Sequence, residues 1–408
     1  MITLLTNEIE TLILSILLLL ASAFLFGKLF EKMKLPKVIG EIVGGMILGY
    51  SCLAFFFPST MQNIFSGFTE QGKILNTFYQ LGLIFLMFSS GYNTSISVDK
   101  KNYKTYGLLF LGATVFPMII GALFTPFFKE YFIGTVNNNI SYILVFVISM
   151  SITSIPVISK IFFDIDMMGS KYSNMVLTVS TIQDLCLWIV LNASINIAQT
   201  GEFQLLSFIK TVAITVGLII LVKVAEIILN KKKIKITSNI IFLSLFVTCL
   251  FVFVLSKFNV NIMYSSFLAG YLIRVLVGEK NIEITKIKDF SFSFFVPIYF
   301  ALVGIQLDVI HNFSLIRFLL FFLIAFGTEF IGTFATMLFS KLKKITCVGL
   351  GITMNARGGP GIVLATTAYA YNIISVEFFT VLILVTMVSS AVAGCWLRKY
   401  RNEIINEG

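Results

Sequence analysis

The chain has 408 residues, of which 57% are hydrophobic and only 12% are charged. Because a soluble domain of this length needs far more polar surface, the composition excludes a soluble globular protein and indicates one that crosses a membrane many times. The net charge of +10 does not indicate nucleic-acid binding, since the lysines lie in short clusters between apolar runs.

Apolar segments long enough to cross a bilayer as helices recur along the whole chain. We therefore predict an all-α polytopic membrane protein, a single membrane domain over residues 1–408 with about thirteen transmembrane helices. No soluble regulatory domain is expected. In chain order the predicted spans lie near residues 9–30, 36–57, 73–92, 104–128, 139–163, 171–199, 205–229, 236–256, 260–277, 286–307, 313–340, 343–371 and 375–397.

The loops between these spans predict how the chain is oriented. Basic residues cluster in alternate connections, at 28–37, 100–104, 160–171, 231–235, 280–288, 341–344 and 398–401. Positively charged loops stay in the cytoplasm, so we expect an N-terminus outside and a cytoplasmic C-terminus. Glu8 and Glu10 precede the first apolar run and argue against a cleaved signal peptide. The expected location is the cell membrane.

The fifth predicted span contains a helix breaker. It reads "VISMSITSIPVISKIFF", with Pro156 inside the span and Thr153 and Ser154 just before it. Proline removes one backbone donor and frees a carbonyl one turn earlier. Non-helical backbone at membrane depth survives only where protein or a water-filled cavity satisfies its polar groups, so the sequence predicts a polar site here.

The twelfth predicted span is interrupted too. It reads "VGLGITMNARGGPGIVLATTA", in which Asn355, Arg357, Gly358, Gly359, Pro360 and Gly361 interrupt an apolar run. The two interrupted spans are an odd number of spans apart and therefore run in opposite directions through the bilayer. This pattern is typical of inverted repeats, whose broken helices cross near the midplane and hold an ion. Kinks that serve packing alone are the alternative.

The sixth predicted span contains a buried acidic residue in the run "TIQDLCLWIV". Asp184 would cost roughly 3 kcal/mol at the bilayer centre, so it needs a compensating function. Desolvation favours the protonated carboxyl group and a dehydrated cation favours the ionised one, so H⁺ and a cation would compete for it. Gln183 offers an amide oxygen, and Thr153 and Ser154 offer others, as alkali-like cations require. Alternatively, Asp184 only pairs with a neighbouring helix and transports nothing.

Several motifs in order resemble one family. "LPKVIGEIVGGMILGY" (35–50), "LGLIFLMFSSGYN" (81–93), "STIQDLCLWIVL" (180–191), "FVPIYFALVGIQLD" (295–308) and "MNARGGPGIVLA" (354–365) are similar to successive helices of the monovalent cation:proton antiporter family 2. This superfamily includes the Kef-type potassium proteins and the bacterial sodium/proton antiporters. The likeness covers nearly the whole chain. It implies the sodium/proton antiporter-like fold, in which two broken helices cross.

The resemblance also implies that the chain has two parts with different roles. A core at about 73–199 and 286–397 would rock against a dimerisation scaffold at about 9–57 and 205–277, in a homodimer. By position, Asp184 would bind either the cation or a proton, and the Gln183-Asp184 pair is the Kef-type arrangement, which favours K⁺ over Na⁺. The predicted ion site comprises Asp184, Gln183, Thr153 and Ser154; the predicted crossover and charge-compensating residues are Pro156, Asn355, Arg357, Gly358, Gly359 and Glu329.

Glu329 departs from the family pattern, which usually has a lysine at this position. It is either a second proton carrier or the partner of Arg357, and we favour the pairing. Arg357 in turn either neutralises helix C-termini at the crossover or meets the ion directly. These alternatives bear on any proton-to-cation ratio taken from relatives.

The predicted function is exchange of a monovalent cation, K⁺ or Na⁺, for H⁺ by alternating access. The partners are then the cation, the proton and the lipid bilayer, whereas a separate regulatory subunit is unknown. The alternative is a cation channel or a membrane sensor of the same fold without coupled exchange. No enzyme, cofactor or resident metal is expected, because the five cysteines lie in or beside apolar runs without CxxC spacing and no nucleophile–base pair stands out.

Overall fold

The computed structural model describes residues 4–33, 35–93, 102–203, 239–258, 260–278, 281–340 and 342–405, and scattered positions between 205 and 224. Within these residues every regular element is a helix, apart from an isolated bridge between Ile133 and Ile374. The all-α prediction is therefore confirmed. Eight of the described helices are long and apolar enough to cross a membrane. The count of thirteen spans is not confirmed. Most of the predicted span 205–229, the whole basic cluster at 231–235 and parts of four others, at 28–37, 100–104, 280–288 and 341–344, lie outside the described residues.

The chain divides into two compact units. The first unit is Met1–Asn93 with Leu206–His311, and the second is Thr94–Leu205 with Asn312–Gly408. The predicted core and scaffold are divided differently, because they place the spans near 73–92 and 286–307 with the core. The two compact units are defined by how the helices pack, whereas the predicted core and scaffold are defined by which helices move during transport. That division stays a prediction.

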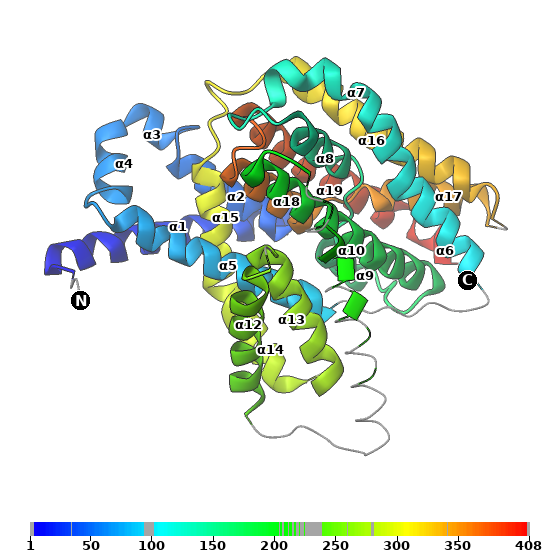
Figure 1. Cartoon of the computed structure of the whole chain (residues 1–408), viewed down its shortest axis with the longest axis horizontal. Helices are drawn as coiled ribbons and strands as arrows, with labels where there is room; N and C mark the ends of the chain where they lie inside the picture. Colours follow the sequence, from blue (N-terminus) through cyan, green and yellow to red (C-terminus); the bar gives the residue numbers. More distant parts are fainter. Residues whose placement is uncertain are drawn as a thin grey trace. The chain divides into compact units, whose positions relative to one another are not determined.

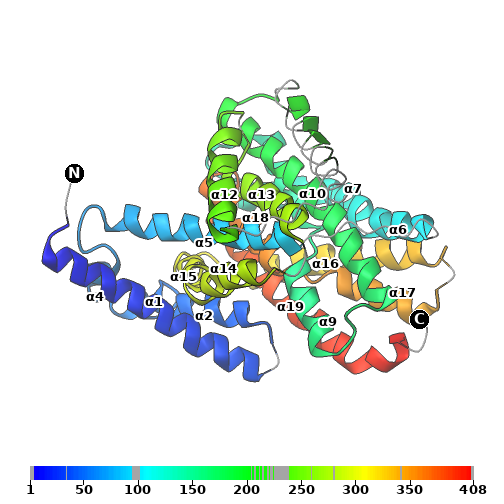
Figure 2. The ribbon, with the colours of Figure 1, turned by 90° about the horizontal axis from the view of Figure 1, so that it is seen from below.

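The first unit contains nine described helices. They are α1 (Thr6–Lys32), α2 (Lys37–Leu48), α3 (Leu53–Phe56), α4 (Pro58–Phe65), α5 (Gln71–Asn93), α12 (Ile240–Ser256), α13 (Ile262–Val277), α14 (Ile282–Ser293) and α15 (Phe295–Ile305). Helices α1, α2 and α15 lie side by side (Figure 2). Glycines permit the close approach of α2 to α15: a Cβ atom on Gly45 would lie 2.0 Å from the Ala301 carbonyl oxygen, and one on Gly304 would lie 2.1 Å from the Ile42 oxygen. Such small residues are how membrane helices pack without a hydrophobic driving force.

The second unit carries all the predicted site residues. Its described elements are α6 (Tyr103–Phe110), the π-helical turn η1 (Leu111–Val115), α7 (Phe116–Phe132), α8 (Asn139–Ser149), α9 (Ile155–Asp164), α10 (Lys171–Thr200), α16 (Leu315–Met337), α17 (Lys344–Met354), α18 (Gly358–Ala370) and α19 (Val376–Ile405). Helices α6, η1 and α7 form one continuous span, and α7 runs beside α16 (Figure 1).

Both predicted interruptions are present. The fifth predicted span is divided into α8 and α9 by residues 150–154, and the twelfth into α17 and α18 by residues 355–357. Pro156 and the glycine run at 358–361 do not lie in the breaks themselves, because they stand in the first turns of α9 and α18. Proline is tolerated in a first turn because the N–H that it lacks has no helical partner there.

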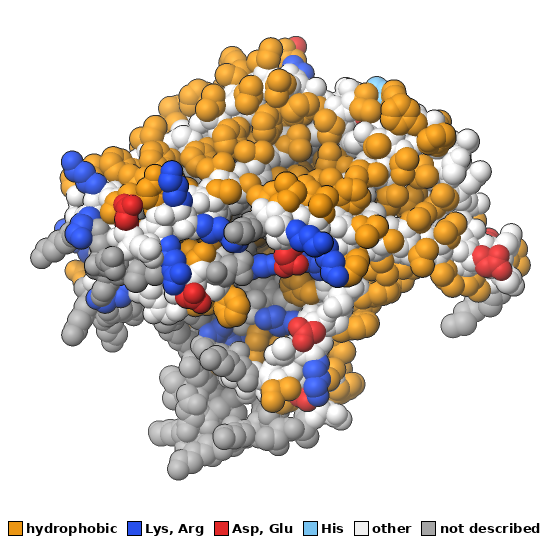
Figure 3. Space-filling model, turned by 180° about the vertical axis from the view of Figure 1, so that it is seen from behind, with side chains coloured by type: hydrophobic (Ala, Val, Ile, Leu, Met, Phe, Trp, Pro, Cys, Tyr) orange, Lys and Arg blue, Asp and Glu red, His pale blue; other side chains and the backbone are white. Residues whose placement is uncertain are grey.

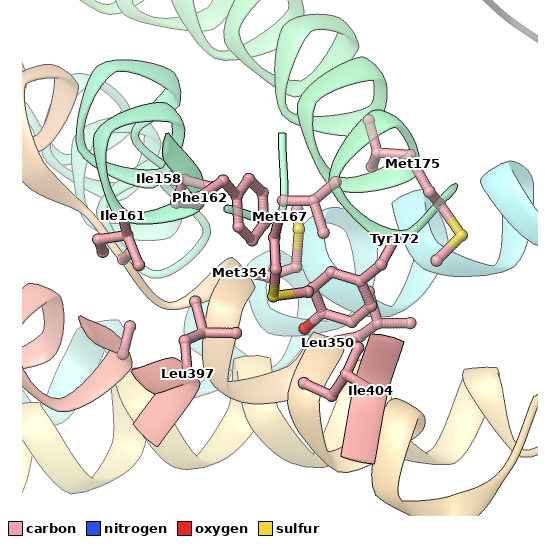
Figure 4. Close-up of a cluster of buried hydrophobic side chains, with 14 of the residues drawn as sticks. Ile158, Ile161, Phe162, Met167, Tyr172, Met175, Leu350, Met354, Leu397 and Ile404 are labelled. Atoms are coloured by element: carbon pink, nitrogen blue, oxygen red, sulfur yellow. The ribbon is translucent and has the colours of Figure 1, made fainter. Parts of the chain in front are cut away.

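An apolar cluster supports this part of the second unit. Side chains of α9, α10, α17 and α19 converge in it, among them Ile158, Phe162, Tyr172, Met354 and Leu397 (Figure 4). Met354 is the last residue of α17, so the cluster fixes the end of a half-helix at the second break. Apolar side chains therefore pack against one side of the polar break.

The outward surface is strongly apolar. Hydrophobic side chains cover much of the face shown in Figure 3. On α7, Leu123 is 73% exposed, and on α16, Leu323 is 64% exposed. Contiguous exposed apolar surface of this kind would be unstable in water and is expected of helices that face lipid.

We predict that Gly45→Ala destabilises the first unit, because the added methyl group cannot fit against the Ala301 carbonyl without shifting α2 from α15. Overpacking of this kind costs about 1–3 kcal/mol. The measurement is the thermal unfolding midpoint in detergent. Gly72→Ala on α5 is the control, since no atom lies within 4 Å of its Cβ position. An unchanged midpoint for Gly45→Ala would contradict the close packing described here.

Candidate functional site

The two helix breaks hydrogen-bond directly to each other. The Ser154 N–H donates to the Ala356 carbonyl at 2.6 Å, and the Thr153 hydroxyl donates to the Met354 carbonyl at 2.6 Å. Both Thr153 and Ser154 are fully buried. The backbone groups that the breaks release are therefore satisfied across the crossover, as a low-dielectric environment demands.

The second break also has a tight backbone contact with the first. Gly358 has φ +41°, and a Cβ atom there would lie 2.4 Å from Ser154 Oγ and from Val157 Cγ2. Its N–H donates to Ser390 Oγ at 3.0 Å, while Asn355 Nδ2 donates to the Gly351 carbonyl at 2.9 Å. Glycine is required at 358 for both conformation and space.

Arg357 binds the end of the half-helix α8. Its Nη1 donates to the Ser149 carbonyl at 2.8 Å and its Nη2 to the Met150 carbonyl at 3.2 Å. The same Nη2 donates to Glu329 Oε2 at 3.1 Å. These contacts match the predicted neutralisation of a helix C-terminus, where carbonyls lack helical partners. They also match the favoured pairing with Glu329.

Gln183 on α10 is anchored by both hydrogens of its amide. Its Nε2 donates to the Ser151 carbonyl in the first break and, at 3.3 Å, to the Ala113 carbonyl in η1. Its Oε1 has no hydrogen-bond partner among the described residues. Because both donors are used, the amide orientation is fixed and its acceptor oxygen stays available.

Asp184 lies on the same helix, directly after Gln183, and is 1% exposed. Ser180, one helical turn earlier, contacts the Met354 sulfur at 4.0 Å, so this face of α10 meets the second break. Neither carboxylate oxygen of Asp184 has a hydrogen-bond partner within the described part of the chain. Asp184 is thus buried in protein rather than directed at lipid.

The charges in this region are not balanced. Arg357 and Glu329 form a buried pair, with side chains 2% and 0% exposed, and together carry no net charge. An ionised Asp184 adds one negative charge that no ion pair in the described ranges neutralises. Burying such a charge unpaired costs several kcal/mol. An ionised Asp184 is therefore unfavourable unless a positive charge lies beside it.

The structure brings most of the predicted site residues into one network. Gln183, Thr153, Ser154, Asn355, Arg357, Gly358 and Glu329 are linked by the contacts described above. Three predicted residues make no comparable contact. Pro156 begins α9, no atom lies within 4 Å of a Cβ position on Gly359, and the Asp184 carboxylate has no hydrogen-bond partner among the described residues. The ion-binding roles stay predictions.

Three participants were not predicted from the sequence. The carbonyl of Ala113, in the π-helical turn η1, accepts a hydrogen bond from Gln183, and Ser390 on α19 accepts one from the Gly358 N–H. Tyr172 joins α10 to Thr353 at the end of α17 with a hydrogen bond of 2.7 Å. Nothing in the local sequence around these residues distinguishes them from ordinary packing positions.

Known proteins are similar to this chain over nearly its whole length. The model of the family described as "Sodium/hydrogen exchanger, transmembrane" matches residues 16–400. The Na(+)/H(+) antiporter NhaS4 of Synechocystis sp. is 24% identical over 401 residues, which cover 95% of this chain and 97% of that protein. The K(+)/H(+) antiporter 1 of Saccharomyces cerevisiae is 26% identical over 391 residues, which cover 89% of this chain and 43% of that protein.

A solved structure shares the fold. The sodium proton antiporter MjNhaP1 from Methanocaldococcus jannaschii matches with a TM-score of 0.66 and 16% sequence identity, covering 98% of this chain and 99% of that one. The predicted antiporter-like fold is therefore confirmed.

We predict that the Arg357–Glu329 pair behaves as a unit. Either Arg357→Met or Glu329→Met leaves one buried charge without its partner and should destabilise the protein by about 3–5 kcal/mol, whereas the double variant should be destabilised by much less than the sum. Thermal unfolding of the four proteins in detergent measures this.

The exposed pair Lys73–Glu70 is the control, with side chains 79% and 42% exposed. Glu70→Gln should change the free energy of unfolding by less than about 1 kcal/mol. Additive effects of the two substitutions at Arg357 and Glu329 would show that the buried pair is not coupled.

Proposed function

The chain belongs to the family of transmembrane sodium/hydrogen exchangers, and we propose that it exchanges a monovalent cation for H⁺ by alternating access with Asp184 as the shared carboxylate. It is accordingly a multi-pass membrane transporter and not an enzyme. The observation that carries the proposal is the buried Asp184 carboxylate, whose two oxygens have no hydrogen-bond partner within the described residues.

Competition for Asp184 couples the two ions. A proton on the carboxyl group removes the charge that attracts the cation, and a bound cation stabilises the ionised form against protonation. Each state neutralises the buried charge, whereas the empty ionised state leaves it uncompensated. Movement of the site between the two sides of the membrane is therefore favoured only when it is occupied, which makes exchange obligatory.

The proposed cation site takes further oxygen ligands from α10 and from the first break. The Gln183 amide presents Oε1 because both of its N–H groups are bound elsewhere. Thr153 and Ser154 use their hydroxyl and amide groups to join the two breaks, so their contribution would come from remaining lone pairs. Amide, hydroxyl and carboxylate oxygens are the ligands that hard cations take.

The cation is K⁺ or Na⁺. One relative is named as a Na⁺/H⁺ antiporter and another as a K⁺/H⁺ antiporter, so the names of the relatives do not separate the two. The Gln183-Asp184 sequence, which resembles the Kef-type pair, favours K⁺. A neutral amide also lowers the negative charge of the site compared with a second carboxylate, which suits the larger, less strongly hydrated ion.

Arg357 and Glu329 act as a static charge pair in this proposal. Arg357 is engaged by two carbonyls of the first break and by Glu329, so it holds the crossover rather than meeting the ion. Glu329 is in turn held by Arg357, which supports the pairing and leaves Asp184 as the single carrier. A homodimer and a scaffold at about 9–57 and 205–277 complete the proposal by resemblance to the family. The basic loops predict an N-terminus outside in the cell membrane.

We predict that Asp184→Asn keeps the fold and abolishes exchange. The neutral amide is cheaper to bury than an ionised carboxylate, so the thermal midpoint should not fall, but no group remains to bind a proton and a cation in turn. The measurement is dequenching of a pH-sensitive dye in proteoliposomes with an imposed pH gradient, upon addition of K⁺ or Na⁺.

Asp166→Asn is the matched control, because that side chain is 84% exposed and pairs with Arg401 at 3.4 Å on the surface. It should retain normal exchange. Proton movement at an unchanged rate in Asp184→Asn would refute the shared-carboxylate mechanism. Cation flux that follows membrane potential without moving protons would instead indicate a channel.

A further inference from the structure

Trp188 on α10 carries a buried hydrogen-bond donor that the exchange proposed above does not use. Its side chain is 3% exposed, and its indole Nε1 has no hydrogen-bond partner among the described residues. An indole N–H can only donate, and a buried tryptophan usually finds an acceptor for it. Because an unpaired buried donor costs free energy, we expect an acceptor within reach of this side chain.

The helix places Trp188 one turn after Asp184. Both residues belong to the uninterrupted helix α10, four positions apart, and both are buried. Residues at this spacing lie on one face of a helix, with their Cβ atoms about 5–6 Å apart. Aromatic side chains on a helix also lean toward its N-terminus and cover the preceding turn. The indole of Trp188 therefore extends over the turn that carries Asp184.

Two residues of α10 have buried acceptor atoms without a hydrogen-bond partner in the described part of the chain. They are Gln183, with its Oε1, and Asp184, with both carboxylate oxygens. At 3.6 residues per turn, Gln183 lies about 140° around the helix from Trp188, whereas Asp184 lies only about 40° from it. Asp184 is therefore the acceptor that the geometry of the helix favours.

The strength of such a bond depends on the charge of the carboxyl group. A hydrogen bond to an ionised acceptor is roughly twice as strong as one between neutral groups. Arg357 is already engaged by the Ser149 and Met150 carbonyls and by Glu329. An ionised Asp184 therefore gains more from the Trp188 N–H than a protonated one does.

We propose that Trp188 donates its indole N–H to the ionised Asp184 carboxylate when the cation is bound, after a change of the Asp184 side-chain rotamer. This inference rests on the proposed function, in which Asp184 takes up a proton and a cation in turn. The bond occupies a lone pair of one carboxylate oxygen and fixes the direction in which the other oxygen faces the cation. Trp188 is thereby a positioning residue that does not touch the cation.

The first experiment removes the N–H and keeps the shape of the side chain. In 3-benzothienylalanine a sulfur atom takes the place of the indole N–H, so this amino acid at residue 188 deletes the donor with little change in packing. In the proteoliposome assay the apparent KM for K⁺ and for Na⁺ should rise by about tenfold, the effect of one hydrogen bond to a charged group. The maximal rate should stay within about twofold, because binding is weakened and the later steps are not. Trp188→Phe should raise KM in the same direction.

Trp396 on α19 is the matched control, since it is the other tryptophan of the chain and its ring stacks on Tyr400 with 4.8 Å between the ring centroids. The same replacement there should leave KM unchanged. An unchanged KM in the residue-188 variant would overturn the inference. A lower maximal rate with an unchanged KM would overturn it too, because Trp188 would then act on helix movement and not on the carboxylate. Absence of exchange in the unmutated protein would overturn the proposed function instead.

The second experiment observes the indole N–H directly and does not depend on transport activity. In the Trp396→Phe protein Trp188 is the remaining tryptophan, and ultraviolet resonance Raman spectra report the hydrogen bonding of its N–H. In saturating K⁺ we expect a strongly bonded N–H, and a weaker bond after Asp184→Asn, because a neutral amide is the poorer acceptor. Identical spectra of the two proteins would overturn the inference, even where the unmutated protein exchanges cations for protons normally.

Discussion

The crossing of two interrupted helices is the constraint on which the second unit depends. Where α8 and α17 end, their last carbonyls have no helical partners, and in a low-dielectric environment each such group must be satisfied by protein. Thr153 and the Ser154 N–H bind the end of α17, and Arg357 binds the end of α8. Each break is thus completed by the other, so neither can form alone. This mutual requirement brings polar side chains from distant parts of the chain to one buried place.

The charged side chains of this buried region then determine its chemistry. A buried arginine is needed to satisfy the carbonyls of α8, and Glu329 compensates its charge. That pair is neutral, and in the proposed mechanism Asp184 is the carboxylate that exchanges a proton for a cation. In the proposed mechanism, the structural charges of Arg357 and Glu329 are therefore separate from the carboxylate that takes part in transport.

The sequence predicted the parts of the fold that depend on hydrophobicity and on helix breakers. Runs of apolar residues indicated membrane helices, and Pro156 and the 354–365 motif located both breaks, although the proline and glycines begin the second half-helices rather than end the first. The free-energy cost of burying a carboxylate identified Asp184 as a candidate site residue. The π turn at Leu111–Val115 and the Ser390 cap could not be predicted, because each depends on which backbone atoms of other helices come close.

The central claim is that one carboxylate, Asp184, carries the proton and the cation in turn. Calorimetric titration of K⁺ and of Na⁺ into the purified protein, in two buffers of different ionisation enthalpy, measures the protons released per bound cation. The account predicts release that approaches about one proton per cation at pH values where the site is protonated, and an apparent affinity that falls as the pH is lowered. Cation binding that releases no proton at any pH, with an affinity independent of pH, would contradict it.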